Sequence, residues 1–121
     1  NTHGFSGVVA DNGKRMPYSQ RWTTKLQKML GDQAVVIPEG LNGRTTCLED
    51  PLGDLDTCDG HLGAMNGRHY LLPCLNSHAP VNVIILALGC NDMKTRFNLA
   101  PDEIALGTQL LIRDIRVSTV C

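Results

Sequence analysis

The sequence predicts a layered α/β fold, and two observations carry that prediction. The first is the continuous apolar run from Val83 to Leu88, which is typical of a central parallel strand covered on both faces. Gly89-Cys90-Asn91-Asp92 ends this run abruptly. The second is the order of elements: helical patterns precede and follow strand-like runs, and such alternation implies parallel crossover connections.

The first helix is expected over residues 18–30. Ser19 is a residue type suited to cap its start, and Gly31 is suited to end it. Four apolar residues recur at helical spacing and form one stripe: Trp22, Leu26, Met29 and Leu30.

The middle of the chain predicts a strand, a long loop and a short helical turn. Ala34-Val-Val-Ile37 is a β-branched run between turn residues and predicts a short buried strand. Residues 38–66 form a polar stretch rich in Gly and Asp, which predicts a functional or flexible loop. A helical turn is expected over residues 70–77, interrupted early by Pro73.

The strand at residues 81–88 is followed by a last helix that begins near Pro101. Proline suits the first helical turn, and Asp102 and Glu103 stand beside the positive end of the helix dipole. One face of this helix carries Ile104, Thr108, Leu111 and Ile115. Two predicted strands leave two open sheet edges and little surface to bury, so the pattern is typical of the middle of a larger domain.

Composition excludes several classes of function. The chain has 121 residues, enough for one domain, and its net charge of −1 without a basic run does not favour nucleic acid. No apolar stretch approaches the roughly 20 residues of a membrane span. The odd number of cysteines, 5, lacks Cys-x-x-Cys pairing and predicts free thiols in a reducing compartment, which favours the cytoplasm.

Two loops leave the carboxyl ends of the predicted strands, where open α/β sheets bind ligands. They are residues 39–46 and residues 89–92, and each contains glycine and asparagine. An asparagine amide and a backbone N–H are the donor types that stabilise an oxyanion during acyl transfer. The alternative is that these residues only make the turns that follow strands.

Other ligand motifs fail on spacing. Pro38 and Arg44 stand where a phosphate loop needs Gly and Lys, and the acidic loop from Asp54 to Gly60 does not match a calcium loop. No histidine pair has metal spacing, so neither a metal site nor a cofactor is predicted. His61, His69 and His78 are interpreted as exposed loop or helix-end residues.

Blocks along almost the whole chain resemble the SGNH (GDSL-type) hydrolases, in the arylesterase-like and acyltransferase-like branch. The block Asn1-Thr-His-Gly4 resembles the continuation of the family's Gly-Asp-Ser-x-Thr-x-Gly motif, and Gly89-Cys90-Asn91-Asp92 resembles its Gly-x-Asn-Asp motif. Further matches in register are Trp22-Thr23, Pro38–Thr46, Tyr70–Leu75, Ser77–Pro80, Lys94, Arg96-Phe97 and Pro101-Asp102.

The resemblance implies a flavodoxin-like three-layer α/β/α sandwich with a parallel sheet, incomplete in this chain. It implies a serine ester hydrolase or acyltransferase that acts on small-molecule esters through an acyl-enzyme, without a cofactor. Carried over by position, the backbone N–H of Gly43 and the side-chain amide of Asn91 form the oxyanion hole. The resemblance leaves a homo-oligomer open.

By the same resemblance, residues 1–121 are an internal part of a single hydrolase domain. The nucleophilic serine is expected immediately before Asn1, and the Asp-x-x-His block beyond Cys121, so the chain alone is expected to be inactive. Residues 52–64 are expected to be an extra loop. Two alternatives stand beside this interpretation: a non-catalytic binding module or degenerate enzyme, and thiol chemistry at Cys90, for which a buried or inert cysteine is the plainer expectation.

Overall fold

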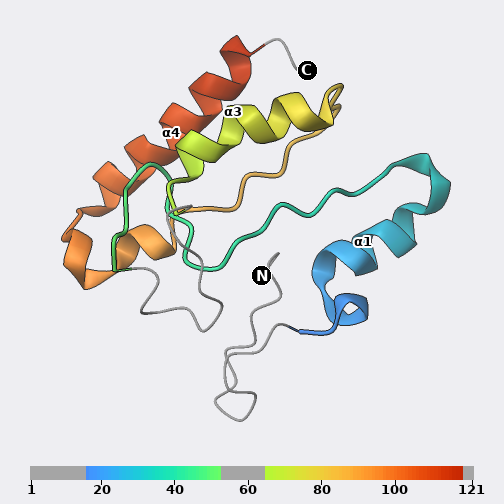
Figure 1. Cartoon of the computed structure of the whole chain (residues 1–121), viewed down its shortest axis with the longest axis horizontal. Helices are drawn as coiled ribbons and strands as arrows, with labels where there is room; N and C mark the ends of the chain where they lie inside the picture. Colours follow the sequence, from blue (N-terminus) through green and yellow to red (C-terminus); the bar gives the residue numbers. More distant parts are fainter. Residues whose placement is uncertain (1–15, 53–64, 119–121) are drawn as a thin grey trace.

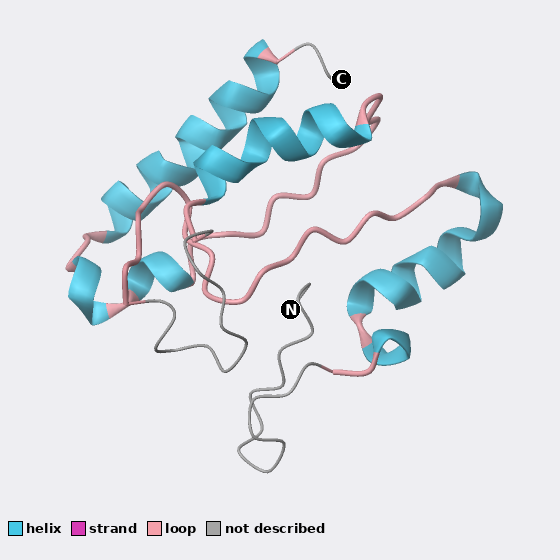
Figure 2. Ribbon diagram, in the orientation of Figure 1, coloured by secondary structure: helices cyan, strands magenta, loops and turns pink. Residues whose placement is uncertain are grey.

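The computed structural model describes residues 16–52 and 65–118 (Figure 1). Helices and connecting segments make up these residues (Figure 2). The α-helices are α1, Trp22–Leu30; α3, Gly67–His78; and α4, Pro101–Val117. Four short 3-10 helices lie between or beside them: η2, Tyr18–Gln20; η3, Gly31–Gln33; η4, Asn91–Met93; and η5, Thr95–Phe97.

Helices α3 and α4 pack side by side and form the structured centre of the described residues (Figure 1). Each contributes a buried leucine, Leu75 from α3 and Leu111 from α4. An ion pair joins the two helices, with Arg68 Nε 2.6 Å from Asp114 Oδ2. Apolar burial and this pair together fix how the two helices lie.

The segment that holds Thr45 and Thr46 threads between these helices. Thr45 forms an isolated parallel bridge with Asn66, and Thr46 O accepts the N–H of Arg68 at 2.9 Å. Two glycines permit this close approach. A Cβ atom on Gly107 of α4 would lie 2.3 Å from Thr46 Oγ1, and one on Gly67 would lie 2.6 Å from Thr45 O.

Helix α4 confirms the sequence prediction. It begins at Pro101, and the carboxylate of Glu103 accepts the Ala100 N–H at 2.7 Å, which satisfies one of the free donors of the first turn. The predicted apolar face is turned inward, since Leu111 is fully buried and Ile104, Thr108 and Ile115 are half-buried.

Helix α3 is longer than the expected turn over residues 70–77, and Pro73 does not interrupt it. The Asn66 side chain explains the earlier start, because its Oδ1 accepts the N–H groups of Arg68 at 3.0 Å and His69 at 3.4 Å. Asn66 is therefore the N-cap of α3, a role that was not predicted for it from the sequence.

Helix α1 differs from its prediction at its start. Residues 18–20 form η2, and the N-cap of α1 is Arg21, so the predicted Ser19 cap is wrong. Gly31 does end the helix, with a φ of 56°. The predicted apolar stripe is not buried, because Met29 is 83% and Trp22 37% exposed.

The two predicted strands are not observed. Residues 34–37 and 81–88 are extended but form no ladder within the described part of the chain (Figure 2). A strand needs a hydrogen-bonded neighbour, and here the Gln27 side chain bonds Ala34 O and Val36 N in place of one. The predicted sheet is therefore not confirmed.

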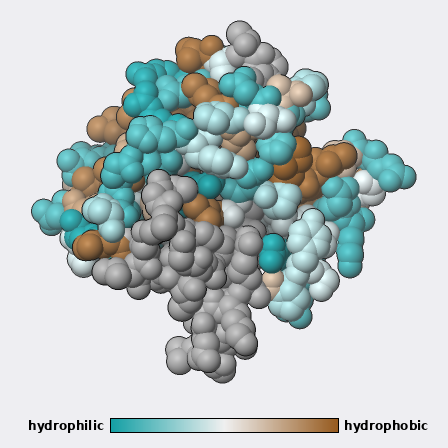
Figure 3. Space-filling model, in the orientation of Figure 1, coloured by the Kyte–Doolittle hydropathy of each residue, from teal (hydrophilic) through white to brown (hydrophobic). Residues whose placement is uncertain are grey.

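Both extended segments leave apolar side chains at the surface. Val35 is 83% exposed and Val83 77% exposed. Hydrophobic residues appear between hydrophilic ones across the visible face of the molecule (Figure 3). Within residues 16–52 and 65–118, no helix has the length and apolar character needed to cross a membrane.

Candidate functional site

The two predicted ligand-binding loops meet in the structure. The Asn91 side-chain amide donates from Nδ2 to the main-chain oxygen of Arg44 at 3.0 Å. This oxygen belongs to the peptide that joins Arg44 to Thr45, so the amide lies one peptide beyond Gly43. The structure thus brings together the regions of both predicted oxyanion donors, which are 48 positions apart in the sequence (91 − 43).

Gly43 and Gly89 give these loops their turns. Gly43 is buried with a φ of 83°, and Gly89 has a φ of 113°. Side chains other than glycine rarely adopt such values, so both turns depend on glycine. The turn at Gly43 orients the peptide groups on either side of it, including the N–H predicted to bind an oxyanion.

Asp92 locks the two loops to each other. Its side chain is almost fully buried and accepts the Thr46 N–H on both carboxylate oxygens, at 3.1 and 3.0 Å. It also accepts the Thr46 hydroxyl at 2.5 Å. No role was predicted for Asp92, although an acidic residue four positions after the end of an apolar run was the available signal.

A second buried carboxylate anchors the end of the first loop. Asp50 accepts hydrogen bonds from Lys94 at 2.9 Å and from two guanidinium nitrogens of Arg96, at 2.9 and 2.7 Å. The Arg96 hydrogen bonds outweigh burial and, with Lys94, hold the pKa of Asp50 below its usual value. The first loop is therefore bonded to the segment after Gly89 at Arg44, Thr46 and Asp50.

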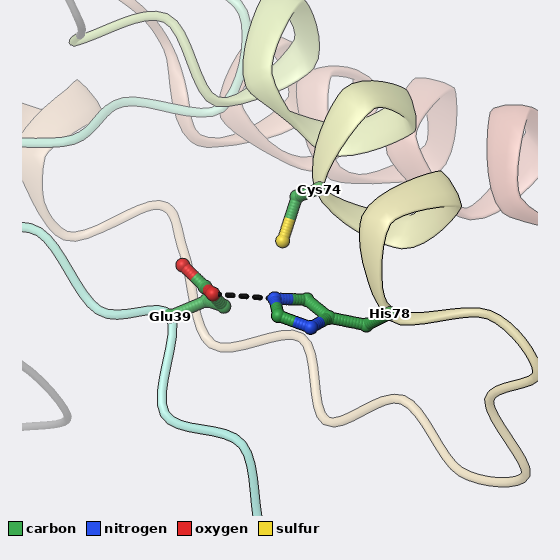
Figure 4. Close-up of side chains that lie close together, drawn as sticks. All are labelled: Glu39, Cys74 and His78. Atoms are coloured by element: carbon green, nitrogen blue, oxygen red, sulfur yellow. Dashed lines mark hydrogen bonds and ion pairs between the residues drawn. The ribbon is translucent and has the colours of Figure 1, made fainter.

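Three side chains from α3 surround Glu39, the first residue of the loop of residues 39–46. Tyr70 donates its hydroxyl to Glu39 Oε2 at 2.7 Å, and His78 Nε2 lies 2.7 Å from Oε1. The Cys74 sulfur lies close to the Glu39 carboxylate and the His78 ring, as Figure 4 shows. Burial raises the pKa of Glu39, but the hydrogen bonds with Tyr70 and His78 outweigh it, so the pKa is lowered overall.

Arg44 connects this cluster with the loop of residues 39–46, which carries the predicted oxyanion donor Gly43 and is called the oxyanion loop below. Its Nη1 donates to the main-chain oxygen of Glu39 at 2.7 Å, and its guanidinium lies 4.3 Å from the centre of the Tyr70 ring. The main-chain oxygen of Arg44 in turn accepts from Asn91. One residue therefore connects the Asn91 amide with the cluster on α3.

His78 corrects the earlier interpretation of the histidines. It stands at the end of α3 as expected, but it is half-buried and bonded to Glu39. Sequence spacing missed the cluster because Glu39 comes from a distant segment. The available signal was Cys74 and His78 at i and i+4, which places both on one face of a helix. His69 is exposed, as predicted, and lies 3.1 Å from Glu49.

The cysteines that the structure describes are free: Cys47, Cys74 and Cys90. Cys90 was expected to be buried or inert; it is exposed, so burial is wrong, and an inert thiol stays a prediction. Cys58 and Cys121 lie outside the described residues, as do His3, His61, the Asn1-Thr-His-Gly4 block and residues 53–64. The rejected calcium-loop match from Asp54 to Gly60 and all of the expected extra loop except Leu52 therefore also lie outside the described residues.

Solved structures resemble this chain over almost its whole length. A carbohydrate acetylesterase family member from Sinorhizobium meliloti is 34% identical with a TM-score of 0.81, and the match covers 98% of this chain and 50% of that protein. The aryl esterase of M. smegmatis is 37% identical with a TM-score of 0.78, covering 93% of this chain and 48% of that one. No family model matches the chain, and no curated protein does.

These matches confirm the resemblance drawn from the sequence blocks: the chain corresponds to part of an SGNH-type esterase. It spans about half the length of the solved structures it matches. Ester hydrolysis is thus supported for the family, and those neighbours have an α/β fold.

Proposed function

We propose that this chain provides the oxyanion-binding part of a serine ester hydrolase or acyltransferase that acts on small esters. The hydrogen bond from Asn91 to Arg44 carries the proposal, because it sets a side-chain amide beside the turn at Gly43. An asparagine amide has two N–H donors, so one can bond Arg44 while the other serves a ligand. The backbone N–H of Gly43 is the second proposed donor.

The chemistry of acyl transfer explains why two donors are needed. A serine oxygen attacks the ester carbonyl while a histidine base takes its proton, and negative charge develops on the carbonyl oxygen. Collapse expels the alcohol and leaves an acyl-enzyme, which water or another alcohol then attacks. Each well-placed donor contributes about 2.7–4 kcal/mol to stabilising this oxyanion.

The proposed donors gain their value from being fixed before the reaction. Asp92 accepts a hydrogen bond from Thr46, and the neighbouring Asn91 donates one to Arg44. Both hydrogen bonds therefore hold the loop that follows Gly43. A donor held by buried contacts does not need to reorganise when charge develops. The serine, histidine and acid are proposed to come from the parts of the domain that flank residues 1–121.

The apolar extended segments support a flavodoxin-like sandwich for the whole domain. Residues 34–37 and 81–88 carry the side chains of buried strands, yet Val35, Val83 and Ile85 are more than half exposed here. We propose that both segments join a parallel sheet with the flanking chain. Residues 1–121 would then be the internal part of one domain.

The proposed substrate class is limited to what the matched proteins have in common, which is an ester bond. One is described as a carbohydrate acetylesterase family member and another as an aryl esterase, so their alcohol portions differ. The proposal is therefore limited to the acyl carbonyl of a small ester, without a cofactor. Hydrolysis and transfer use the same oxyanion hole and differ only in the acceptor.

The first test is to read the coding sequence on both sides of this segment. Codons for Gly-Asp-Ser before Asn1 and an Asp-x-x-His block after Cys121 are expected. A start codon directly before Asn1 with a stop directly after Cys121 would contradict the esterase proposal for this product. The non-catalytic binding module would then take its place.

The second test measures the proposed donor in the protein encoded by that extended sequence. Asn91→Ala is expected to lower kcat for p-nitrophenyl acetate by about 10²–10³-fold, with a smaller change in KM, because the donor acts mainly on the transition state. Asn76→Ala is a matched control, since Asn76 is exposed on α3. An unchanged kcat for a folded Asn91→Ala variant would rule out this role.

A further inference from the structure

Three side chains of different types converge beside the oxyanion loop without a role in the proposed reaction. They are Glu39, Cys74 and His78. One atom of each (a carboxylate oxygen, the thiol sulfur and an imidazole nitrogen) lies within 4.8 Å of the corresponding atoms of the other two. Figure 4 shows the three side chains turned toward a common space between α3 and the segment of Glu39.

Helix geometry explains why two of these residues act together. Cys74 and His78 are one turn apart on α3, so their side chains stand on the same face. Glu39 approaches that face from the loop, held there by the Tyr70 hydroxyl on its other oxygen. Each of the three residues is partly exposed, which leaves a path for a small ion from solvent.

The donor set indicates which ions would fit. Thiolate and imidazole ligands favour zinc and similar borderline-soft metals, whereas magnesium and calcium take oxygen ligands. Zinc sites with three protein ligands from cysteine, histidine and carboxylate leave a fourth position for water. In a tetrahedral site with bonds of about 2.0–2.3 Å, ligand atoms lie about 3.3–3.8 Å apart. Metal binding would therefore lengthen the 2.7 Å separation of His78 Nε2 and Glu39 Oε1 and draw the three residues' ligand atoms, which lie within 4.8 Å of one another, to that spacing.

We propose that Glu39, Cys74 and His78 form a binding site for a zinc-like divalent metal ion. This site is separate from the oxyanion donors and does not depend on the proposed esterase function.

Metal binding releases protons from the cluster. The metal forms bonds to a carboxylate oxygen of Glu39, to His78 Nε2 and to the cysteine sulfur, and the thiol proton passes to solvent. The hydrogen bond between His78 Nε2 and Glu39 Oε1 is broken, and the ring binds as neutral imidazole with its remaining proton on Nδ1. With a carboxylate and a thiolate as ligands, two negative charges balance the 2+ ion. Arg44 donates from Nη1 to the backbone oxygen of Glu39, and its guanidinium lies 4.3 Å from the centre of the Tyr70 ring.

Cobalt(II) is the probe for the test, because it accepts the same ligands as zinc and reports thiolate bonding by a charge-transfer absorption band. The protein encoded by the extended coding sequence, which contains residues 1–121, is titrated with cobalt(II) at neutral pH under reducing conditions. A band that saturates at one equivalent and is abolished by one equivalent of zinc is expected. Absence of such a band in the unsubstituted chain overturns the proposal.

Substitutions assign the ligands. Cys74→Ser should remove the charge-transfer band, and His78→Gln should weaken cobalt binding at least tenfold while keeping the band at higher cobalt concentration. The matched controls are Cys47→Ser and His69→Gln, which change the same residue types outside the cluster and should leave the titration unaltered. A band that survives Cys74→Ser, or that disappears with Cys47→Ser, overturns the assignment. Far-ultraviolet circular dichroism on each variant confirms that helices remain.

Discussion

The carboxylate of Asp92 holds the backbone and the hydroxyl of Thr46 at the same time, through hydrogen bonds of 3.1, 3.0 and 2.5 Å. Both residues are buried, with exposed fractions of 1%. This pair joins the loop that carries Gly43 to the loop that carries Asn91. The arrangement of the proposed oxyanion donors therefore depends on a residue that is not itself proposed to touch the substrate.

Replacing Asp92 tests how much this contact stabilises the chain. Asp92→Asn keeps the size of the side chain but puts an amide nitrogen where an acceptor is needed, so Thr46 loses at least one charge-assisted hydrogen bond. We expect the free energy of unfolding to fall by about 1.5–3 kcal/mol, measured by urea denaturation at 222 nm. Asp32→Asn, at an exposed position, should change it by less than about 0.5 kcal/mol. Equal effects at the two positions would contradict the role given to Asp92.

Replacing Asn66 tests the cap of α3. Asn66 satisfies two free N–H groups at the start of the helix and also donates from Nδ2 to Cys47 O at 3.2 Å and Glu49 at 2.9 Å. Asn66→Ala removes all of these bonds, and the free energy of unfolding should fall by about 1–2 kcal/mol. Asn76→Ala, on the exposed face of the same helix, is the control and should have little effect. A small loss at Asn66 would show that the helix start does not depend on its cap.

Asp50 predicts a pH dependence of stability. Its pKa is lowered in the folded chain by Arg96 and Lys94, so folding favours the ionised carboxylate. Its contribution is fully present above the ordinary aspartate pKa of about 3.9 and is lost as the pH falls through the lower folded value. Urea denaturation between about pH 6 and pH 2 should therefore show this contribution declining below about pH 4.

Asp50→Asn separates this contribution from that of the other carboxylates. The variant should be less stable at neutral pH, because its amide cannot replace both charged contacts, and its stability should fall less steeply as the pH is lowered. Asp32→Asn should keep the original slope. If Asp50→Asn also keeps it, the salt bridges to Lys94 and Arg96 do not control the acid response.

Local sequence signals determined the parts of the structure that depend on neighbouring residues. Proline at the first turn with acids beside it fixed the start of α4, and Gly31 fixed the end of α1. Block matches along the chain also identified the SGNH-type esterases, which the matched solved structures confirm. The cap at Asn66 was missed, although its signal is equally local, because Asn66 was placed in the loop of residues 38–66 and the helix was expected to start only at residue 70.

Only the tertiary structure determined which residues far apart in the sequence come into contact. Asn91 meets Arg44 and Asp92 meets Thr46 across 47 and 46 positions (91 − 44 and 92 − 46), and no sequence period encodes such contacts. The cluster of Glu39 with Cys74 and His78 arises in the same way. The apolar runs 34–37 and 81–88 show the opposite case. Their side chains have the character of buried strands, but a strand exists only where a neighbouring backbone completes its hydrogen bonds, and the described residues provide none for them.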